Sequence, residues 1–200
     1  MPDRYDTSGN PEDEYYPGTS VLINLEDIRD PEELLERETE LQLAAYREVF
    51  GSFDEGITPA LPYFYHLHRL IFGRLFMWAG RPRTVGISKG GTPFCPPQNI
   101  AVMMGALFAG LERERWLEGL GPEEFLERAA YYVCEFNAVH PFREGNGRAI
   151  RFYLDALSAR ACGDIFDWTL AGEEEYWRAC VAGFAEDYGP MLAVLRRCAA

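Results

Sequence analysis

Apolar residues recur at helical spacing through most of the chain. The first such stretch follows Asp30-Pro31, a cap residue and a proline at the first helical position that are typical of a helix start, and it predicts a helix to about Phe50. Another helix opens at the Gly-Asn-Gly of residues 145–147 and stops at Cys162. The same periodicity predicts five further helices, over about residues 58–78, 99–115, 122–138, 172–186 and 190–198.

One internal segment breaks this helical pattern. Residues 83–94 contain four positions with strand character, followed by the turn dipeptide Gly90-Gly91. The strand-like residues are Thr84, Val85, Ile87 and Ser88. This pattern predicts a short β-hairpin standing out from the helical body. Residues 1–20 are polar and rich in turn formers, so we expect an extended arm. The predicted class is all-α with one small hairpin, in a single domain spanning residues 1–200.

Charge narrows the possible partners. The formal net charge is −13, and residues 1–55 hold sixteen acidic residues against four arginines. A chain this acidic repels phosphate backbones, so general binding to nucleic acid or to an anionic membrane is disfavoured. The acidic first quarter is interpreted as a solvated face, with a basic protein partner as the alternative.

The cysteine pattern and the hydropathy of the chain indicate a location in the cytoplasm. The five cysteines are widely spaced and contain no C-x-x-C pair, which is typical of free thiols in a reducing cytosol. The first residues form no secretory leader, and no apolar stretch approaches the length of a membrane-spanning helix. We therefore expect a soluble cytoplasmic protein.

Residues 140–151, HPFREGNGRAIR, combine several groups that bind phosphate. The segment joins two predicted helices, and the small residues 145–147 open the second one. Small residues at a helix start let successive backbone N–H groups point at one anion, and the helix dipole adds favourable charge. Arg148 and Arg151 are three positions apart and so lie on nearly the same helix face. Two guanidinium groups beside an amide nest predict a polyphosphate site.

Two further residues of this segment supply catalytic chemistry. Glu144 comes immediately before the nest, where it can hold a hard cation such as Mg²⁺ against phosphate oxygens. His140 has a side chain that can take a proton from a hydroxyl nucleophile, and Pro141 is expected to bias its backbone towards extended geometry. Each residue alone is more often an ordinary core or surface residue. Their combination within one short segment favours a nucleotide site with a base and a metal carboxylate.

The string HPFREGNGRAIR matches in full the signature of the Fic family, His-x-Phe-x-Asp/Glu-Gly-Asn-Gly-Arg-x-x-Arg. Trp78-Ala79-Gly80 before the hairpin resembles the approach to the Fic flap, and Tyr16-Pro17-Gly18-Thr19 resembles bacterial Fic toxins. The resemblance implies an all-α Fic fold, a helical bundle with a small β-hairpin flap beside the active-site loop. It also implies transfer of AMP from ATP to a protein hydroxyl.

The resemblance assigns a role to each motif residue. His140 is expected to deprotonate the Ser, Thr or Tyr hydroxyl of the target, and Glu144 to bind Mg²⁺ at the α- and β-phosphates. Arg148 is expected to stabilise the leaving charge, and Arg151 to hold the γ-phosphate. Phe142 is the expected buried anchor of the loop. The residues expected to cradle the phosphates with their amides are Gly145, Asn146 and Gly147.

Two regions outside the motif are also assigned by resemblance. The flap is expected to register the target segment by strand addition and to cover the nucleotide. Its residues are Ile87, Ser88, Lys89 and Gly90. Tyr176 resembles the position that packs near the adenine. By contrast, His66 and His68 are interpreted as ordinary helix residues, because side chains two positions apart on a helix do not face each other.

Sequence differences between branches of the Fic family indicate which group is transferred and how the enzyme is inhibited. In Doc-type members a Lys stands at the position of Gly147 and phosphate is transferred, so glycine favours AMP transfer. Many Fic proteins carry an inhibitory helix with the pattern Ser/Thr-x-x-x-Glu-Gly/Asn, and this chain has only incomplete copies. These are Ser8…Glu12 followed by Asp13, Thr169…Glu173 followed by Glu174, and the shorter segment 52–56. The chain thus resembles Fic toxins whose inhibitory helix comes from a small separate antitoxin, with a glutamate that engages Arg151.

The target follows from resemblance alone. Such toxins are associated with the ATPase subunits of type II topoisomerases, DNA gyrase B and ParE of topoisomerase IV. Two alternatives stay open: transfer of another group such as phosphate, another nucleoside monophosphate or phosphocholine, and a nucleotide-binding interaction module without turnover.

Overall fold

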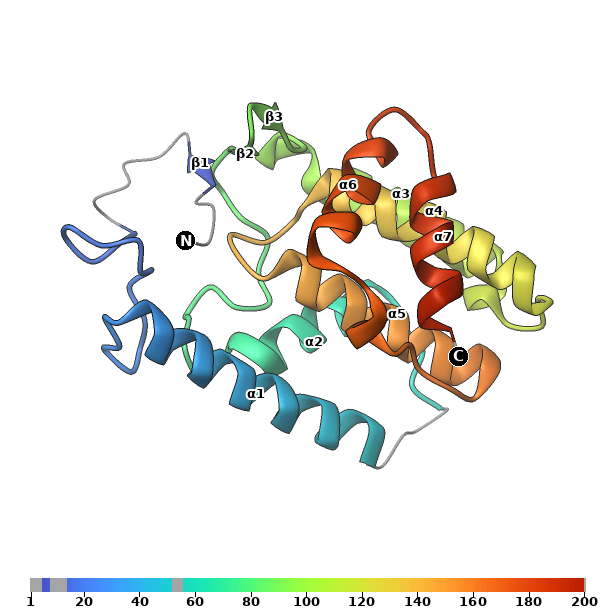
Figure 1. Ribbon diagram of the computed structural model, residues 1–200, viewed down its shortest axis with the longest axis horizontal. Helices are drawn as coiled ribbons and strands as arrows, with labels where there is room; N and C mark the ends of the chain where they lie inside the picture. The colour runs from blue at the N-terminus through green and yellow to red at the C-terminus, as the bar shows by residue number, and fades with distance from the viewer. Residues whose placement is uncertain (1–4, 8–13, 52–55, 200) are drawn as a thin grey trace.

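The computed structural model describes residues 5–7, 14–51 and 56–199, and within them the chain forms a helical bundle with a small sheet at one end (Figure 1). The α-helices are α1 (Pro31–Gly51), α2 (Leu61–Phe72), α3 (Ile100–Arg113), α4 (Pro122–Val139), α5 (Asn146–Cys162), α6 (Glu173–Gly183) and α7 (Gly189–Cys198). Three short 3-10 helices are η2 (Pro97–Asn99), η3 (Arg115–Leu117) and η4 (Trp168–Leu170). The predicted helical architecture with a small β element is confirmed.

Local sequence signals explain where α1 begins. Asp30 Oδ1 accepts hydrogen bonds from the backbone N–H groups of Glu32 at 2.9 Å and Glu33 at 3.0 Å. These bonds satisfy two of the donors that a helix leaves unpaired in its first turn. The predicted capping residue is therefore confirmed, and α1 runs to Gly51, one residue beyond the predicted end.

The predicted helix over 58–78 was wrong at both ends, since α2 begins at Leu61 and stops at Phe72. Gly73 follows, and a Cβ there would stand 2.5 Å from the carbonyl oxygen of Arg69. The chain then turns back, and the N–H of Gly80 donates to Nδ1 of His68 at 2.9 Å. This long-range bond outweighs the apolar periodicity that continues to Trp78.

The core is built around buried aromatic rings from four helices and the motif loop. Phe64 of α2 stacks on Phe136 of α4 and on Phe142 of the loop, each with ring centroids 5.4 Å apart. Phe108 of α3 and Tyr153 of α5 complete the cluster, with centroids 5.4 Å apart. Because Phe142 is fully buried, the loop that carries the candidate chemistry is anchored in the core, as predicted.

The hairpin is present and gains a third strand. Strands β2 (Ile87–Lys89) and β3 (Thr92–Pro93) pair antiparallel around Gly90 and Gly91. Both glycines have positive φ, +56° and +78°, which a tight hairpin turn requires. The additional strand is β1 (Asp6–Thr7), which pairs antiparallel with the other edge of β2 and gives the order β1-β2-β3. The sequence did not predict β1.

The part of the predicted arm over residues 14–20 is also more structured than expected. It forms turns against the body of the molecule, with Tyr15 and Tyr16 buried.

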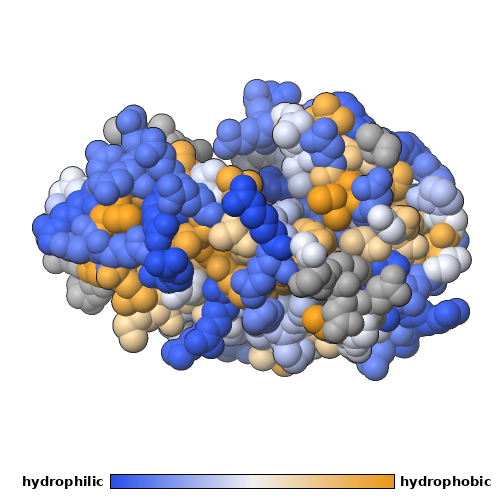
Figure 2. Space-filling model, turned by 90° about the horizontal axis from the view of Figure 1, so that it is seen from below, coloured by the Kyte–Doolittle hydropathy of each residue, from blue (hydrophilic) through white to orange (hydrophobic). Residues whose placement is uncertain are grey.

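Figure 2 views the molecule from below, the side on which α1 lies, and shows mostly hydrophilic residues with hydrophobic ones in separate groups. None of the described helices combines the length and the apolar character that crossing a membrane would need.

Candidate active site

The motif residues lie on the loop between α4 and α5, which extends towards the small sheet in Figure 1. His140 ends α4 in the left-handed conformation, with φ +50° and ψ 62°. The extended geometry expected before Pro141 was therefore wrong. The N–H of His140 still donates to the carbonyl of Phe136 at 2.9 Å, so the residue serves as a left-handed helix cap, which turns the chain sharply into the loop.

The ring of His140 has a defined tautomer. Its Nδ1 lies 3.1 Å from the backbone carbonyl of Asn137, and a carbonyl only accepts, so Nδ1 carries the proton and Nε2 is left as an acceptor. The hydroxyl of Tyr5 lies 2.7 Å from Nε2. Phe94 stacks on the imidazole, with centroids 3.8 Å apart. Burial lowers the pKa of His140 to about 3, so the ring is neutral at physiological pH.

Asn146 closes the loop on itself. Its side-chain Oδ1 accepts from the N–H of Phe142, and its Nδ2 donates to the carbonyl of the same residue, both at 2.8 Å. The side chain is almost fully buried. The asparagine of the motif therefore fixes the loop through its side chain, while its backbone N–H remains at the start of α5.

His68 supports the loop from α2, a role that the sequence did not reveal. Its Nδ1 accepts from Gly80 at 2.9 Å, so its Nε2 donates to the carbonyl of Glu144 at 3.0 Å. The ring also stacks on Phe142 with centroids 3.7 Å apart. Burial lowers the pKa of His68 to about 3, which keeps this tautomer neutral. The interpretation of His68 as an ordinary helix residue was therefore wrong, because its ring joins α2 to the motif loop.

The start of α5 offers unpaired amides. Gly145 has φ +77° and caps the helix without a side-chain acceptor. Its own N–H donates to Glu144 Oε1 at 2.8 Å, so one of the amides predicted to cradle phosphate is already bonded to that carboxylate. The N–H groups of Asn146, Gly147 and Arg148 fill the first turn, where a helix provides no acceptor. They are the amides available to an anion.

Arg148 is held by contacts from two other elements. Its Nη1 donates to Glu38 of α1 at 2.6 Å, and its guanidinium lies 4.5 Å from the ring centre of Phe72. Glu144 lies farther away, 4.0 Å from Nη2. Burial raises the pKa of Glu38, although the charge of Arg148 opposes the shift. Glu38 is a site residue that sequence reasoning missed, because more than a hundred positions separate it from Arg148.

Arg151 lies one turn further along α5, beside Tyr176. Its guanidinium is 5.2 Å from the ring centre of Tyr176 and 5.9 Å from that of Trp168. Among the residues that the structure describes, no carboxylate lies within ion-pair distance of it. The structure thus brings Tyr176 to the motif, and Arg151 keeps its charge available for a ligand.

Arg83 ties the flap to the end of α4 and was also missed. Its buried guanidinium donates to four backbone carbonyls at 2.5–3.2 Å. The carbonyls belong to Val85, Cys95, Val139 and His140. These bonds hold the two ends of the flap, at Val85 and Cys95, against the end of α4, and the hairpin of Ile87–Lys89 and Gly90 lies between those ends. Burial lowers the pKa of Arg83, and the four acceptors compensate for the lost hydration.

The carboxylate of Glu144 fits a nucleotide-bound magnesium ion. The described part of the chain holds no group of three or more His, Cys, Asp or Glu side chains arranged for a metal. Mg²⁺ at nucleotides commonly takes one protein carboxylate and completes its shell with phosphate and water oxygens. The Glu144 side chain is 35% exposed at the mouth of the amide nest, so it can serve as that carboxylate.

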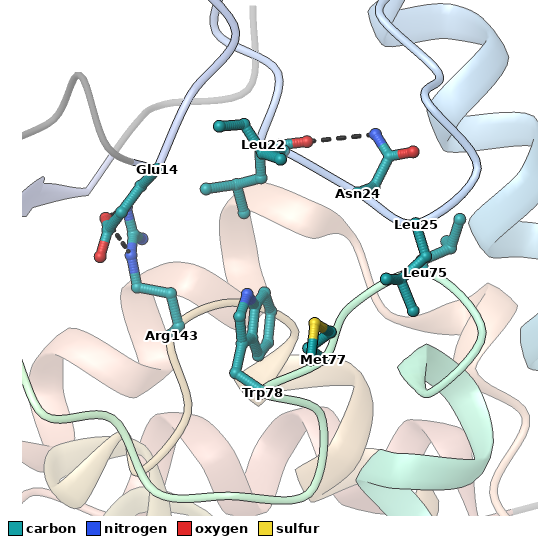
Figure 3. Close-up of a pocket in the computed structure, with 9 residues that line it drawn as sticks. Glu14, Leu22, Asn24, Leu25, Leu75, Met77, Trp78 and Arg143 are labelled. Carbon is teal, nitrogen blue, oxygen red and sulfur yellow. Dashed lines mark hydrogen bonds and ion pairs between the residues drawn. The ribbon is translucent and has the colours of Figure 1, made fainter.

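A cavity of about 250 Å³ lies next to the motif but contains none of the predicted site residues. Figure 3 shows it between the segment from Glu14 to Leu25, the turn with Met77 and Trp78, and Arg143. Arg143 donates to Glu14 at 2.8 Å and to the hydroxyl of Tyr15 at 2.8 Å. These bonds fasten the N-terminal part of the chain to the motif loop.

Comparison with known proteins gives consistent matches. The Fic/DOC family model matches residues 59–158, half of the chain. "Probable protein adenylyltransferase Fic" of Salmonella typhimurium is 34% identical over 194 residues, which cover 96% of this chain and 94% of that protein. "Protein adenylyltransferase VbhT" of Bartonella schoenbuchensis is 34% identical over 97% of this chain, and the match spans only 40% of VbhT.

Among solved structures, a similar one is the Bartonella effector protein BepC from Bartonella tribocorum, crystallised with bound AMPPNP. The two chains superpose with a TM-score of 0.81 at 25% identity. The match covers 93% of this chain and 95% of BepC. A shared fold across almost the whole of both chains agrees with the match of the family model.

Proposed function

The chain belongs to the Fic/DOC family, and from this premise we propose that it is a protein adenylyltransferase, which transfers AMP from ATP to a Ser, Thr or Tyr hydroxyl of a target protein. The observation that carries the proposal is the single loop that presents an imidazole acceptor, a carboxylate, an amide nest and two arginines. Relatives at 34% identity over nearly the whole chain bear the name of protein adenylyltransferases.

His140 acts as the base in this proposal. Because Nδ1 is bound to the carbonyl of Asn137, Nε2 is the atom that accepts the proton of the target hydroxyl. The hydroxyl oxygen forms a bond to the α-phosphorus, and the bond between that phosphorus and the bridging oxygen to the β-phosphate breaks. Pyrophosphate leaves, and the proton stays on the imidazole until solvent removes it.

The phosphates are bound by groups at the start of α5. The N–H groups of Asn146 and Gly147 and the guanidiniums of Arg148 and Arg151 supply donors and positive charge on one side of the loop. Glu144 would hold Mg²⁺, which neutralises phosphate charge when bound. Tyr176, beside Arg151, is proposed to pack near the adenine.

Gly147 favours transfer of AMP over transfer of phosphate. A Cβ at this position would meet no atom within 4 Å, so the fold has room for a longer side chain here. In Doc-type members, which transfer phosphate, a lysine stands at this position. The glycine leaves the nest open, as in the members that transfer AMP.

We further propose that the protein is toxin-like and restrained by a small antitoxin, with DNA gyrase B or ParE as its target. Support comes from Arg151, which the resemblance makes the partner of the inhibitory glutamate. Of the incomplete inhibitory patterns, Ser8…Glu12 and most of 52–56 lie outside the described residues. Thr169 and Glu173 belong to different helices, η4 and α6, so they do not form an inhibitory helix.

The proposal is tested by incubating the purified chain with ATP, Mg²⁺ and either gyrase B, ParE or a cell lysate, followed by intact-mass measurement. A gain of one AMP on a discrete protein is expected with the wild type and with the control variant His66→Ala. The gain should vanish with His140→Ala. An adduct of another mass would identify another transferred group, and ATP binding without any adduct would indicate a binding module.

A further inference from the structure

The chain's own N-terminal segment occupies the place expected for a target. Strand β1 pairs with β2, with Asp6 opposite Ser88 and Thr7 opposite Ile87. These are residues of the flap that is expected to register a target by strand addition. Strand β3 occupies the opposite edge of β2, so both edges of this strand are already paired within the chain.

Tyr5, the residue before this strand, points its hydroxyl at the candidate base. The hydroxyl lies 2.7 Å from His140 Nε2, the nitrogen that the tautomer leaves as an acceptor, so the phenol donates this hydrogen bond. The phenol ring packs edge-on against the imidazole and against Phe94, with centroids 5.3 Å and 6.0 Å apart. A general base must lie within hydrogen-bonding distance of the proton that it removes, and this pair meets that condition.

The surroundings of the phenol keep it protonated until a base acts. Burial raises the pKa of Tyr5, and the charge of Glu144 raises it further. The hydrogen bond to Nε2 of His140 places the phenolic oxygen at the candidate base. Strand pairing and the hydrogen bond to His140 both hold the segment there.

We propose that Tyr5 is an acceptor of the enzyme's own reaction, so that the chain transfers AMP to Tyr5 within the same molecule. The inference rests on the proposed function. In the reaction, the Tyr5 oxygen bonds to the α-phosphorus of ATP, the bond to the β-phosphate bridging oxygen breaks, and pyrophosphate departs. The phenolic proton moves to Nε2 of His140. The product is a phosphodiester between Tyr5 and AMP.

The purified chain is incubated with ATP and Mg²⁺. Its intact mass is measured before and after incubation, and the modified peptide is then mapped. The wild type should gain one AMP on Tyr5. Tyr5→Phe keeps the ring contacts and removes the nucleophile, so its adduct should be lost while transfer to a separate target persists. Tyr63→Phe, on a half-exposed tyrosine of α2, is the matched control and should gain AMP as the wild type does.

A second measurement tests whether transfer occurs within one molecule. The first-order rate constant for labelling Tyr5 should be independent of protein concentration. His140→Ala chains mixed with the wild type should stay unlabelled at Tyr5. Efficient labelling of those chains, or a rate constant that rises with concentration, would overturn transfer within one molecule.

The possible failures are distinguishable. Wild-type protein that modifies a separate target but never Tyr5, or that carries AMP on a different residue, would overturn the inference and leave the proposed function standing. Wild-type protein that modifies neither itself nor any target would overturn the proposed function, and the inference with it.

Discussion

Gly145 and Gly147 stand two positions apart in the motif and meet different constraints. Gly145 has a positive φ, and a Cβ there would stand 2.3 Å from the ring of Phe72. Gly147 is helical and faces open space. The fold therefore requires the first glycine, whereas it leaves room for a side chain at the second.

This difference predicts opposite results for two alanine substitutions. Gly145→Ala should lower the free energy of unfolding by about 3 kcal/mol, since it adds left-handed strain and a clash with Phe72. Gly147→Ala should leave stability unchanged or raise it by up to about 1 kcal/mol, because alanine favours helix, while weakening ATP binding. Urea unfolding and ATP titration of both variants check the prediction. Equal stability of the two would contradict it.

The pKa of His140 is set by the residues that cover it. Tyr5→Ala opens the ring to water, so we expect the pKa of His140 to rise from about 3 towards its ordinary value of 6.5. His68 has a pKa of about 3 from burial elsewhere and should not change. The chain has three histidines, so imidazole nitrogen shifts measured by NMR between pH 4 and 8 can follow each. An unchanged His140 titration would show that Tyr5 does not bury the ring.

The contiguous motif could be predicted from the sequence because helix periodicity places its residues locally. The supporting residues could not. Glu38, His68 and Arg83 act on the loop across contacts between distant segments, and nothing in their local sequence distinguishes them from ordinary helix or loop residues. Tyr5 belongs to a polar segment whose sequence does not predict a strand. Its place beside His140 depends on the pairing of β1 with β2.

Helix α1 reaches the candidate active site through Glu38. Glu38 is buried and bonded to Arg148, so it fixes the position of the guanidinium at the start of α5. The end of α2, which the sequence pattern predicted wrongly, also depends on a contact between distant residues. The chain turns after Phe72, and the hydrogen bond from the N–H of Gly80 to His68 fixes this turn.

We predict that Glu38→Ala raises the KM for ATP by about tenfold and changes kcat less. A tenfold change corresponds to about 1.4 kcal/mol of binding free energy, which is within the range for the loss of a hydrogen bond to a charged group. Glu38→Gln keeps an acceptor and should restore most of the affinity. Glu40→Ala, on an exposed part of α1, is the control. Steady-state kinetics with a modified target measures these values. A lower KM in Glu38→Ala would mean that Glu38 restrains Arg148 instead of positioning it.

One buried carboxylate, that of Asp155, joins three distant parts of the chain. Asp155 of α5 accepts from the hydroxyl of Tyr46 on α1 at 2.7 Å, from the indole of Trp168 at 2.9 Å and from the N–H of Phe166 at 3.1 Å. Burial raises its pKa to about 6 from 3.8, although these three donors oppose the shift.

This shift predicts a pH dependence of stability. The folded chain keeps a proton on Asp155 up to about pH 6, whereas the unfolded chain releases it near pH 3.8. The contribution to stability is thus full below pH 3.8 and is lost as pH rises through 6. Relative to Asp155→Asn, which does not titrate, the wild type should lose about 1.4 kcal/mol between pH 5 and pH 7.5. Urea unfolding of both proteins at the two pH values measures the difference, and a constant gap would contradict it.

The strand β1 on the edge of β2 also has a thermodynamic consequence for recognition. A partner strand that uses this edge must bind chains in which β1 has detached, so its apparent dissociation constant equals the intrinsic constant divided by the detached fraction. If one chain in a hundred is open, recognition weakens a hundredfold with no change in any contact to the partner. Changes in the strand residues Asp6 and Thr7 would then raise or lower the apparent affinity for every partner strand by the same factor, by shifting that fraction.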